Sequence, residues 1–274
     1  MKKHLGVLLA AAATAVASFA LLASAAQAAT PAPPYEDFAG CPSPAENNNV
    51  AFCFKTVFTG GHVDLGSREV PISNPVTLRG GISFLGANYL ANSEGGIVPV
   101  QQKVPGGLIG LTGMSWLDEL LDQPQLRLYA TIELAGTPGS LEVDPWTLPI
   151  KVHLENPVLG SNCFIGSDAN PINLRLTTGT TNPPAPNAPI SGTEPGEFES
   201  EASRPEVLLQ KGGSYVDNAY AVPAANGCQI QLGSITIPVN GFINATSHLP
   251  AAAGTNEAAL NFERSLVLPE VVYP

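Results

Sequence analysis

The chain has few charged side chains, and basic ones are the scarcest. Only 13% of its 274 residues are charged, with 12 Lys and Arg against 23 Asp and Glu, which gives a formal net charge of −11. Nucleic acids and anionic lipid surfaces are bound through clustered Lys and Arg side chains. We therefore expect neither class of partner.

Signatures of catalysis and of metal binding are also missing. The chain has no G-x-S-x-G elbow, no H-E-x-x-H helix motif and no C-x-x-C pair, which are the patterns of serine hydrolases and of many zinc sites. Ser115 lies in a stretch that superficially resembles the elbow, but a helix cap explains it better. We therefore predict no metal ion and no cofactor.

The one long apolar run lies at the N-terminus. Lys2 and Lys3 precede an uncharged run over residues 5–22, and residues 26–28 (AQA) give the small-x-small pattern of a cleavage site. This predicts a cleaved signal peptide over residues 1–28. No second run of 18 apolar residues follows, so we expect no transmembrane anchor. The mature protein is predicted to be secreted, and either extracellular or loosely associated with the cell envelope.

The four cysteines all lie in the predicted exported part. Disulfides form in exported proteins, so two are expected. Three pairings are possible. We favour Cys41–Cys53 and Cys163–Cys228, because each bond then joins neighbours in the sequence and avoids threading between the two halves of the chain.

Apolar residues that alternate with polar ones predict a β-rich fold. The clearest alternation is at residues 126–135, and period two indicates a strand with one face in the core and the other in water. The pattern recurs at residues 148–154, 172–176 and 235–239, with further candidates at 207–210 and 262–268. Near the start of this region, strands are expected on either side of a turn at residues 59–61, as in a hairpin.

Helical patterns are scarce by comparison. One short connector helix is predicted between Ser115 and Pro124, and no segment is suited to cross over between parallel strands. The fold class is therefore all-β, an antiparallel sandwich or barrel-like domain. It is expected to occupy residues 51–274 as a single domain, after an extended N-terminal segment over residues 29–50.

Two segments depart from the strand pattern. Residues 80–110 mix glycine with many apolar side chains, and they are expected to cover the core or line a pocket. Residues 182–205 are rich in proline and are interpreted as an exposed, semi-rigid acidic loop, with weak calcium binding or catalysis as less favoured alternatives. The glutamates of this loop are Glu194, Glu197, Glu199 and Glu201.

Three histidines remain after the predicted cleavage: His62, His153 and His248. His62 and Asp64 are two residues apart on a predicted strand, so they share a face. They are the candidate catalytic residues, as a base and the group that orients it. The alternative is a solvated outer face. His153 is expected to lie on the polar side of its strand.

Several segments resemble one group of known proteins. They are residues 75–81 (PVTLRGG), 103–108 (KVPGGL), 148–163 (LPIKVHLENPVLGSNC), 176–192 (LTTGTTNPPAPNAPISG) and 216–228 (VDNAYAVPAANGC). Together they are similar to secreted actinobacterial proteins of mostly unknown function, some of which are labelled cholesterol esterase. The segments that contain Cys163 and Cys228 both belong to this resemblance, which supports pairing them.

Two functions follow as hypotheses. The first is a non-catalytic binding or envelope-associated module for an apolar or lipid ligand, a cell-envelope component or another protein. It is favoured by the missing catalytic motif, the low charge and the apolar segment at residues 80–110. The alternative is a secreted carboxylic ester hydrolase that acts on sterol or lipid esters, which is implied only by the resemblance.

Overall fold

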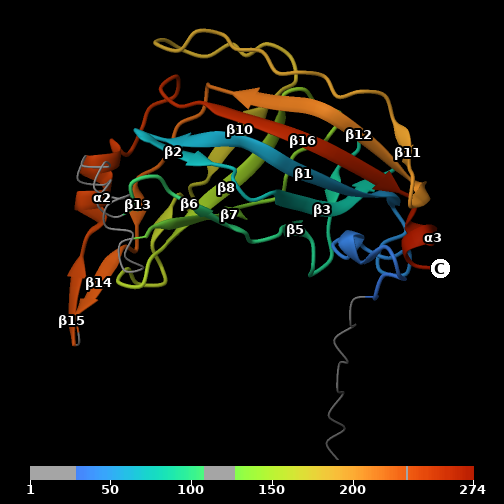
Figure 1. The fold of residues 1–274 in the computed structure, drawn as a ribbon, viewed down its shortest axis with the longest axis horizontal. Coiled ribbons are helices and arrows are strands. Elements are labelled where there is room, and N and C mark those ends of the chain that lie inside the picture. The colour runs from blue at the N-terminus through green and yellow to red at the C-terminus, as the bar shows by residue number, and fades with distance from the viewer. Residues whose placement is uncertain (1–28, 108–126, 233) are drawn as a thin grey trace, which may run out of the picture.

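The computed structural model describes residues 29–107, 127–232 and 234–274, and it contains two antiparallel sheets packed face to face (Figure 1). The predicted signal peptide and the predicted helix after Ser115 lie outside the described residues. The predicted all-β, antiparallel fold is confirmed, and of the two expected forms, sandwich or barrel-like domain, the sheets form the sandwich.

The larger sheet is built around one long strand, β1 (Val50–Leu65). On one side β1 pairs with β16 (Ala258–Val267), then β12 (Arg204–Asp217) and β11 (Glu199–Glu201). On the other side it pairs with β2 (Arg68–Pro71) and β3 (Val76–Ser83), and β3 carries β4 (Tyr89–Leu90) and β5 (Gly96–Ile97).

The smaller sheet is centred on β8 (Trp146–Glu155). One neighbour is β7 (Tyr129–Leu134), followed by β6 (Gln101–Lys103); on its other side lie β9 (Phe164–Ile165), β10 (Ile172–Leu176) and, beyond β9, β13 (Ala225–Asn226). A separate hairpin joins β14 (Gln229–Leu232) to β15 (Ile235–Pro238), and the described helices are η1 (Glu36–Phe38), α2 (Asn240–Ser247) and α3 (Pro269–Val272).

The core lies between the two sheets. Phe54 and Leu78 of the larger sheet pack in one cluster with Ile132, Leu148 and Leu174 of the smaller sheet, and all are buried. Ile132, Leu148 and Leu174 are positions that the alternation in the sequence assigns to the inner face. Burial of such side chains, at roughly 25 cal/mol per Å² of apolar surface, is the main force that holds the sheets together.

The turn predicted at residues 59–61 is a β-bulge within β1, so that prediction is wrong. The register against β16 shifts between Phe58 and Gly60, and the strand continues to Leu65. Phe58 and Val63 both face the core although they are five positions apart, which in a regular strand would put them on opposite faces. A bulge inserts the extra residue that makes this possible. The hairpin turn comes after Leu65 instead.

The strand predicted at residues 235–239 forms, but not where its pattern places it. Ile235 and Ile237 were expected to face the core, whereas 62% and 41% of their surface is exposed. β15 belongs to the two-stranded hairpin and not to either layer of the sandwich. Alternation of apolar and polar residues indicates a strand with one apolar face. It does not indicate which part of the protein covers that face.

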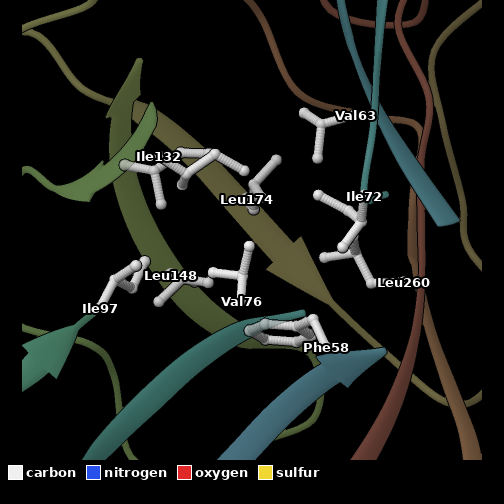
Figure 2. Close-up of a pocket in the computed structure, with 10 residues that line it drawn as sticks. Phe58, Val63, Ile72, Val76, Ile97, Ile132, Leu148, Leu174 and Leu260 are labelled. Atoms are coloured by element: carbon white, nitrogen blue, oxygen red, sulfur yellow. The ribbon is translucent and has the colours of Figure 1, made fainter. Parts of the chain in front are cut away.

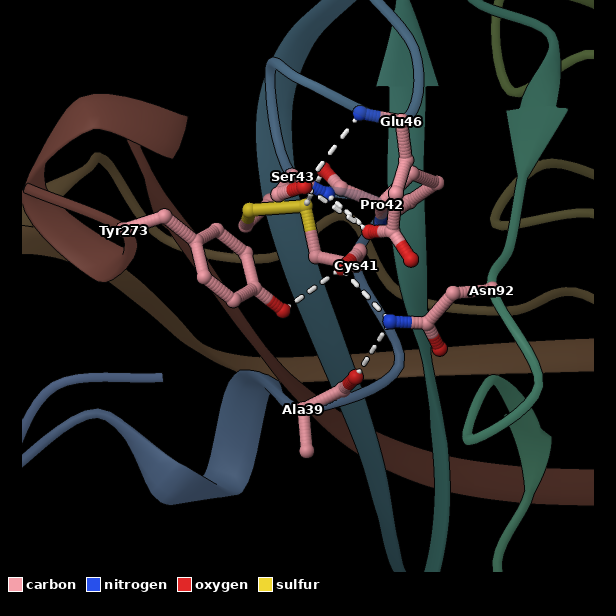
Figure 3. The surroundings of a disulfide bond; sticks show 8 residues. Ala39, Cys41, Pro42, Ser43, Glu46, Asn92 and Tyr273 are labelled. Carbon is pink, nitrogen blue, oxygen red and sulfur yellow. Dashed lines mark hydrogen bonds between the residues drawn. A yellow bond between two sulfur atoms is a disulfide. The ribbon is translucent and has the colours of Figure 1, made fainter. Parts of the chain in front are cut away.

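Both predicted disulfides are confirmed, as Cys41–Cys53 and Cys163–Cys228. The first fastens the N-terminal segment to the outer face of β1, in a second small apolar cluster. That segment, predicted as extended, is held in turns and in η1. Figure 3 shows the Tyr273 hydroxyl donating to the Cys41 carbonyl at 2.7 Å and the Asn92 amide donating to the same oxygen at 3.0 Å.

No helix in the described part of the chain is long and apolar enough to cross a membrane.

Candidate functional site

The two candidate catalytic residues lie where the sequence places them, on one face of β1. His62, Asp64 and the exposed Glu69 of β2 bring one ligand atom each to within 4.8 Å of the others. His62 Nε2 lies 3.9 Å from an Oε1 atom of Glu257. This face is the outer one. The alternate residues of the strand, Val63 and Leu65, point into the core.

The other two histidines are held in different ways. His153 stacks on Phe164 with ring centroids 4.4 Å apart, and its Nδ1 lies 3.2 Å from Glu155. His248 is the left-handed cap residue that follows α2. Among the described residues, no serine hydroxyl forms a hydrogen bond with a histidine ring; Ser115 lies outside them. The described residues therefore show no nucleophile paired with a base, as a serine esterase requires.

The predicted apolar pocket corresponds to a small cavity between the sheets. Figure 2 shows Phe58, Val76 and Ile97 of the larger sheet facing Ile132 and Leu148 of the smaller one. Ile97 belongs to the segment over residues 80–110, which covers part of the core as predicted. The cavity measures about 20 Å³, which is space for about one water molecule. Ligand sites are usually at least about 300 Å³.

Larger clefts lie along the side of the sandwich where the two sheets meet. One, of about 300 Å³, is lined from both sheets, by Trp146 at the start of β8 and by Tyr215 and Arg264 of β12 and β16. The other, of about 440 Å³, is lined among others by Arg175 and by Asp217. Asp144 lines both clefts. We call the two together the Asp144 groove.

The polar wall of the groove is held in place by backbone pairing between the sheets. Thr177, which follows β10, exchanges two backbone hydrogen bonds with Val216 of β12, at 3.1 and 2.9 Å. The Thr177 hydroxyl donates to an Oδ2 atom of Asp144 at 2.9 Å. The next residue, Thr178, donates to Glu194 of the acidic loop. The groove thus gathers carboxylates from two loops around a fixed edge.

The floor of the first cleft is a set of packed aromatic rings next to one cation. Tyr215 stacks on Phe262 at 4.1 Å between ring centroids, and Trp146 meets Tyr215 edge-on at 5.8 Å. An Nη2 atom of Arg264 donates to the Tyr215 hydroxyl. Trp146 Nε1 and Arg264 Nε are buried with no hydrogen-bond partner. Buried donors without a partner are rare, and each one calls for an explanation such as strain, an ordered water or a ligand.

Electrostatics ties these groups together. Burial raises the pKa of the Tyr215 hydroxyl above its ordinary value; Arg264 opposes the shift, and the carboxylates of Asp144 and Glu194 add to it. In the second cleft, burial raises the pKa of Asp217 although backbone N–H groups of Arg175 and Ala219 donate to its carboxylate at 2.7 and 2.8 Å. Shifted groups that cluster in a cleft indicate a candidate site.

Sequence reasoning missed this groove. Its members come from β8, β10, β12, β16 and the acidic loop, so no local motif joins them. Glu194 was grouped with the solvated glutamates, yet it alone of the four lines a cleft of the groove. The sequence offers no clear signal for it, because Tyr215 and Arg264 lie on strands that carry other large polar side chains, such as Lys211.

Fold and groove together define the class of protein: an antiparallel β-sandwich with two disulfides and a polar groove along one side. Comparison of the chain with known proteins identifies no relative that would define it further. No protein-family model, no curated protein and no solved structure matches the chain.

Proposed function

We propose that the protein is a secreted, non-catalytic binding module whose ligand site is the Asp144 groove. The observation that carries the proposal is the groove itself, about 300 and 440 Å³ in its two parts. Both volumes fall within the range of ligand sites. The backbone pairing of Thr177 with Val216 joins the two sheets at the groove, which favours binding without a large cost of ordering.

The chemistry of the groove favours a polar, hydroxyl-rich envelope component over an apolar ligand. Asp144 and Glu194 offer carboxylate acceptors, whereas Arg264 and Arg175 offer guanidinium donors along the same groove. Sugar hydroxyls both donate and accept, so an uncharged or weakly charged polysaccharide matches such a wall. A strongly anionic polymer is disfavoured by the net charge of −11.

The interior is less suited to a lipid. Its apolar cavity of about 20 Å³ is far smaller than a sterol needs. Binding an apolar ligand there would require the two sheets to separate and lose core contacts. The lipid-binding form of the proposal is for this reason the second choice, and the polar groove is the first.

The experiment is co-sedimentation of the purified protein with the insoluble envelope fraction of the cells that export it. We expect the protein in the pellet and its release by soluble envelope polysaccharide. Vesicles that contain cholesteryl ester should bind none of it. A protein that stays in the supernatant with envelope material but binds the vesicles would contradict the proposal.

The ester hydrolase remains the alternative, and one assay separates it from the binding module. Purified protein is incubated with a cholesteryl ester and with a short-chain ester, and the released acid is measured. We expect no hydrolysis above the rate without protein. Hydrolysis that a single Ser→Ala substitution abolishes, with Ser115 the first to test, would replace the binding module with an esterase.

A further inference from the structure

Three acidic side chains lie side by side across adjacent strands on the outer face of the larger sheet. Asp64 of β1 pairs directly with Glu69 of β2. On its other side the Asp64 N–H donates to the carbonyl of Glu257, the residue before β16, at 2.8 Å. Like charges directly opposite one another destabilise a sheet. This row therefore needs a compensating positive charge.

No lysine or arginine in the described part of the chain supplies that charge. Within residues 29–107, 127–232 and 234–274, no lysine or arginine forms an ion pair with Asp64, Glu69 or Glu257; the group within reach is His62, 3.9 Å from Glu257.

A second histidine in the same chain shows the compensated arrangement. His153 also lies between two glutamates, Glu133 and Glu155, at 3.8 and 3.2 Å. There, however, the Nζ atom of Lys151 lies 3.8 Å from Glu133, and the imidazole is stacked on Phe164. The two groups have similar composition, and they differ in the neighbouring lysine and in the ring that covers the histidine.

We propose that His62, Asp64 and Glu69 form a binding site for a divalent first-row transition metal ion of the Zn²⁺ class. One imidazole nitrogen and two carboxylate oxygens, all within 4.8 Å of one another, form the mixed nitrogen and oxygen donor set that such ions take. The imidazole disfavours Ca²⁺ and Mg²⁺, which prefer oxygen alone. The sequence alone predicted no metal site, so the proposed site differs from that prediction.

The backbone fixes two of the three ligands, and the third can adjust. His62 and Asp64 alternate on one strand next to the bulge, while Glu69 follows the tight turn at Gly66, where φ is +69°. Ligands about 2.0–2.1 Å from Zn²⁺ lie about 3.4 Å from one another in a tetrahedron. Rotation of the exposed Glu69 side chain brings its carboxylate closer to the other two ligands, and Glu257 lies 3.9 Å from His62 Nε2 beside the site.

The test is calorimetric titration of untagged, EDTA-treated protein with ZnCl₂, and with CaCl₂ as the comparison ion. We expect one Zn²⁺ per chain and no binding of Ca²⁺ at the same concentrations. His62→Ala and Glu69→Gln should each weaken Zn²⁺ binding at least about tenfold, the lower end of the effect of losing an outer-shell partner. The matched control His153→Ala should bind Zn²⁺ as the wild type does.

Thermal unfolding adds a readout that a merely structural glutamate would not give. In EDTA, Glu69→Gln should be as stable as the wild type or more stable, because it removes one of the repelling charges. With Zn²⁺ present the order should reverse. Failure to bind Zn²⁺, unchanged binding by His62→Ala, or tighter binding of Ca²⁺ would overturn the proposal. None of these outcomes depends on the Asp144 groove.

Discussion

The α-carbon of Gly61 lies directly against the backbone carbonyl of Ala259 on the neighbouring strand. Gly61 has a φ of +106°, and a Cβ atom built on it would lie 1.9 Å from the Ala259 oxygen. Only glycine adopts this conformation readily and leaves room for the carbonyl. Gly61 directly follows the bulge, between Phe58 and Gly60, that keeps Phe58 and Val63 on the same face of β1.

Gly61→Ala should therefore destabilise the protein by about 3 kcal/mol or more, since strain of about 1–3 kcal/mol adds to a clash with backbone. Gly60→Ala is the matched control, because its Cβ would meet only the Asn261 amide, at 3.7 Å. It should change the free energy of unfolding by less than about 1 kcal/mol. Urea unfolding of both variants measures the difference. Equal effects would show that the bulge does not require glycine at position 61.

The two disulfides should contribute unequally to stability. They close loops with sequence separations of 12 and 65 residues, which correspond to about 3 and about 4 kcal/mol in the chain-entropy model. The double variant Cys163→Ser, Cys228→Ser should thus lose more stability than Cys41→Ser, Cys53→Ser. Chemical unfolding of both double variants tests this. The reverse order would show that packing of the N-terminal segment outweighs loop entropy.

Acid should weaken the attachment of the N-terminal segment. Partial burial opposes ionisation of Asp37, but hydrogen bonds from Arg204 and Lys55 outweigh it and lower the pKa of this carboxyl below its ordinary value of 3.8. The stabilisation is complete above the ordinary pKa and is lost as the pH falls through the lowered one.

The corresponding variant is Asp37→Asn. It should cost about 1 kcal/mol at neutral pH, the upper end for solvent-accessible ion pairs. Its melting temperature should also fall less than that of the wild type as the pH is lowered below about 4. Melting curves recorded at successive pH values measure both effects. Parallel curves for the two proteins would contradict the role of Asp37.

The layers and the disulfides were predictable because their causes are local or topological. Alternation at residues 148–154 gives β8 its inner face whatever its partners are, and neighbouring cysteines join without threading. The bulge was not predictable, because Gly60-Gly61 favours a turn and a bulge alike. The exposure of Ile235 depends on which surface covers β15, and the local pattern does not contain that information.

The candidate sites divide in the same way. His62 and Asp64 share a strand, so their proximity follows from the period of two. Glu69 lies beside them because of the pairing register between β1 and β2, and that register is set by the turn at Gly66. The Asp144 groove needs the relative placement of both sheets, since Tyr215 and Trp146 are far apart in the sequence and meet only across the sandwich.

The most direct test of the proposed function is the affinity of groove variants for soluble envelope polysaccharide. Asp144 and Glu194 line the groove and are exposed, so Asp144→Asn and Glu194→Gln should fold normally. Glu197→Gln, in the same loop, and Glu199→Gln, at the start of β11, lie outside the groove and serve as matched controls.

We predict that the groove variants bind the polysaccharide at least about fivefold more weakly than the wild type, as loss of about 1 kcal/mol of binding free energy implies. The controls should bind as the wild type does. Equal binding by all four variants would contradict the assignment of the groove as the ligand site.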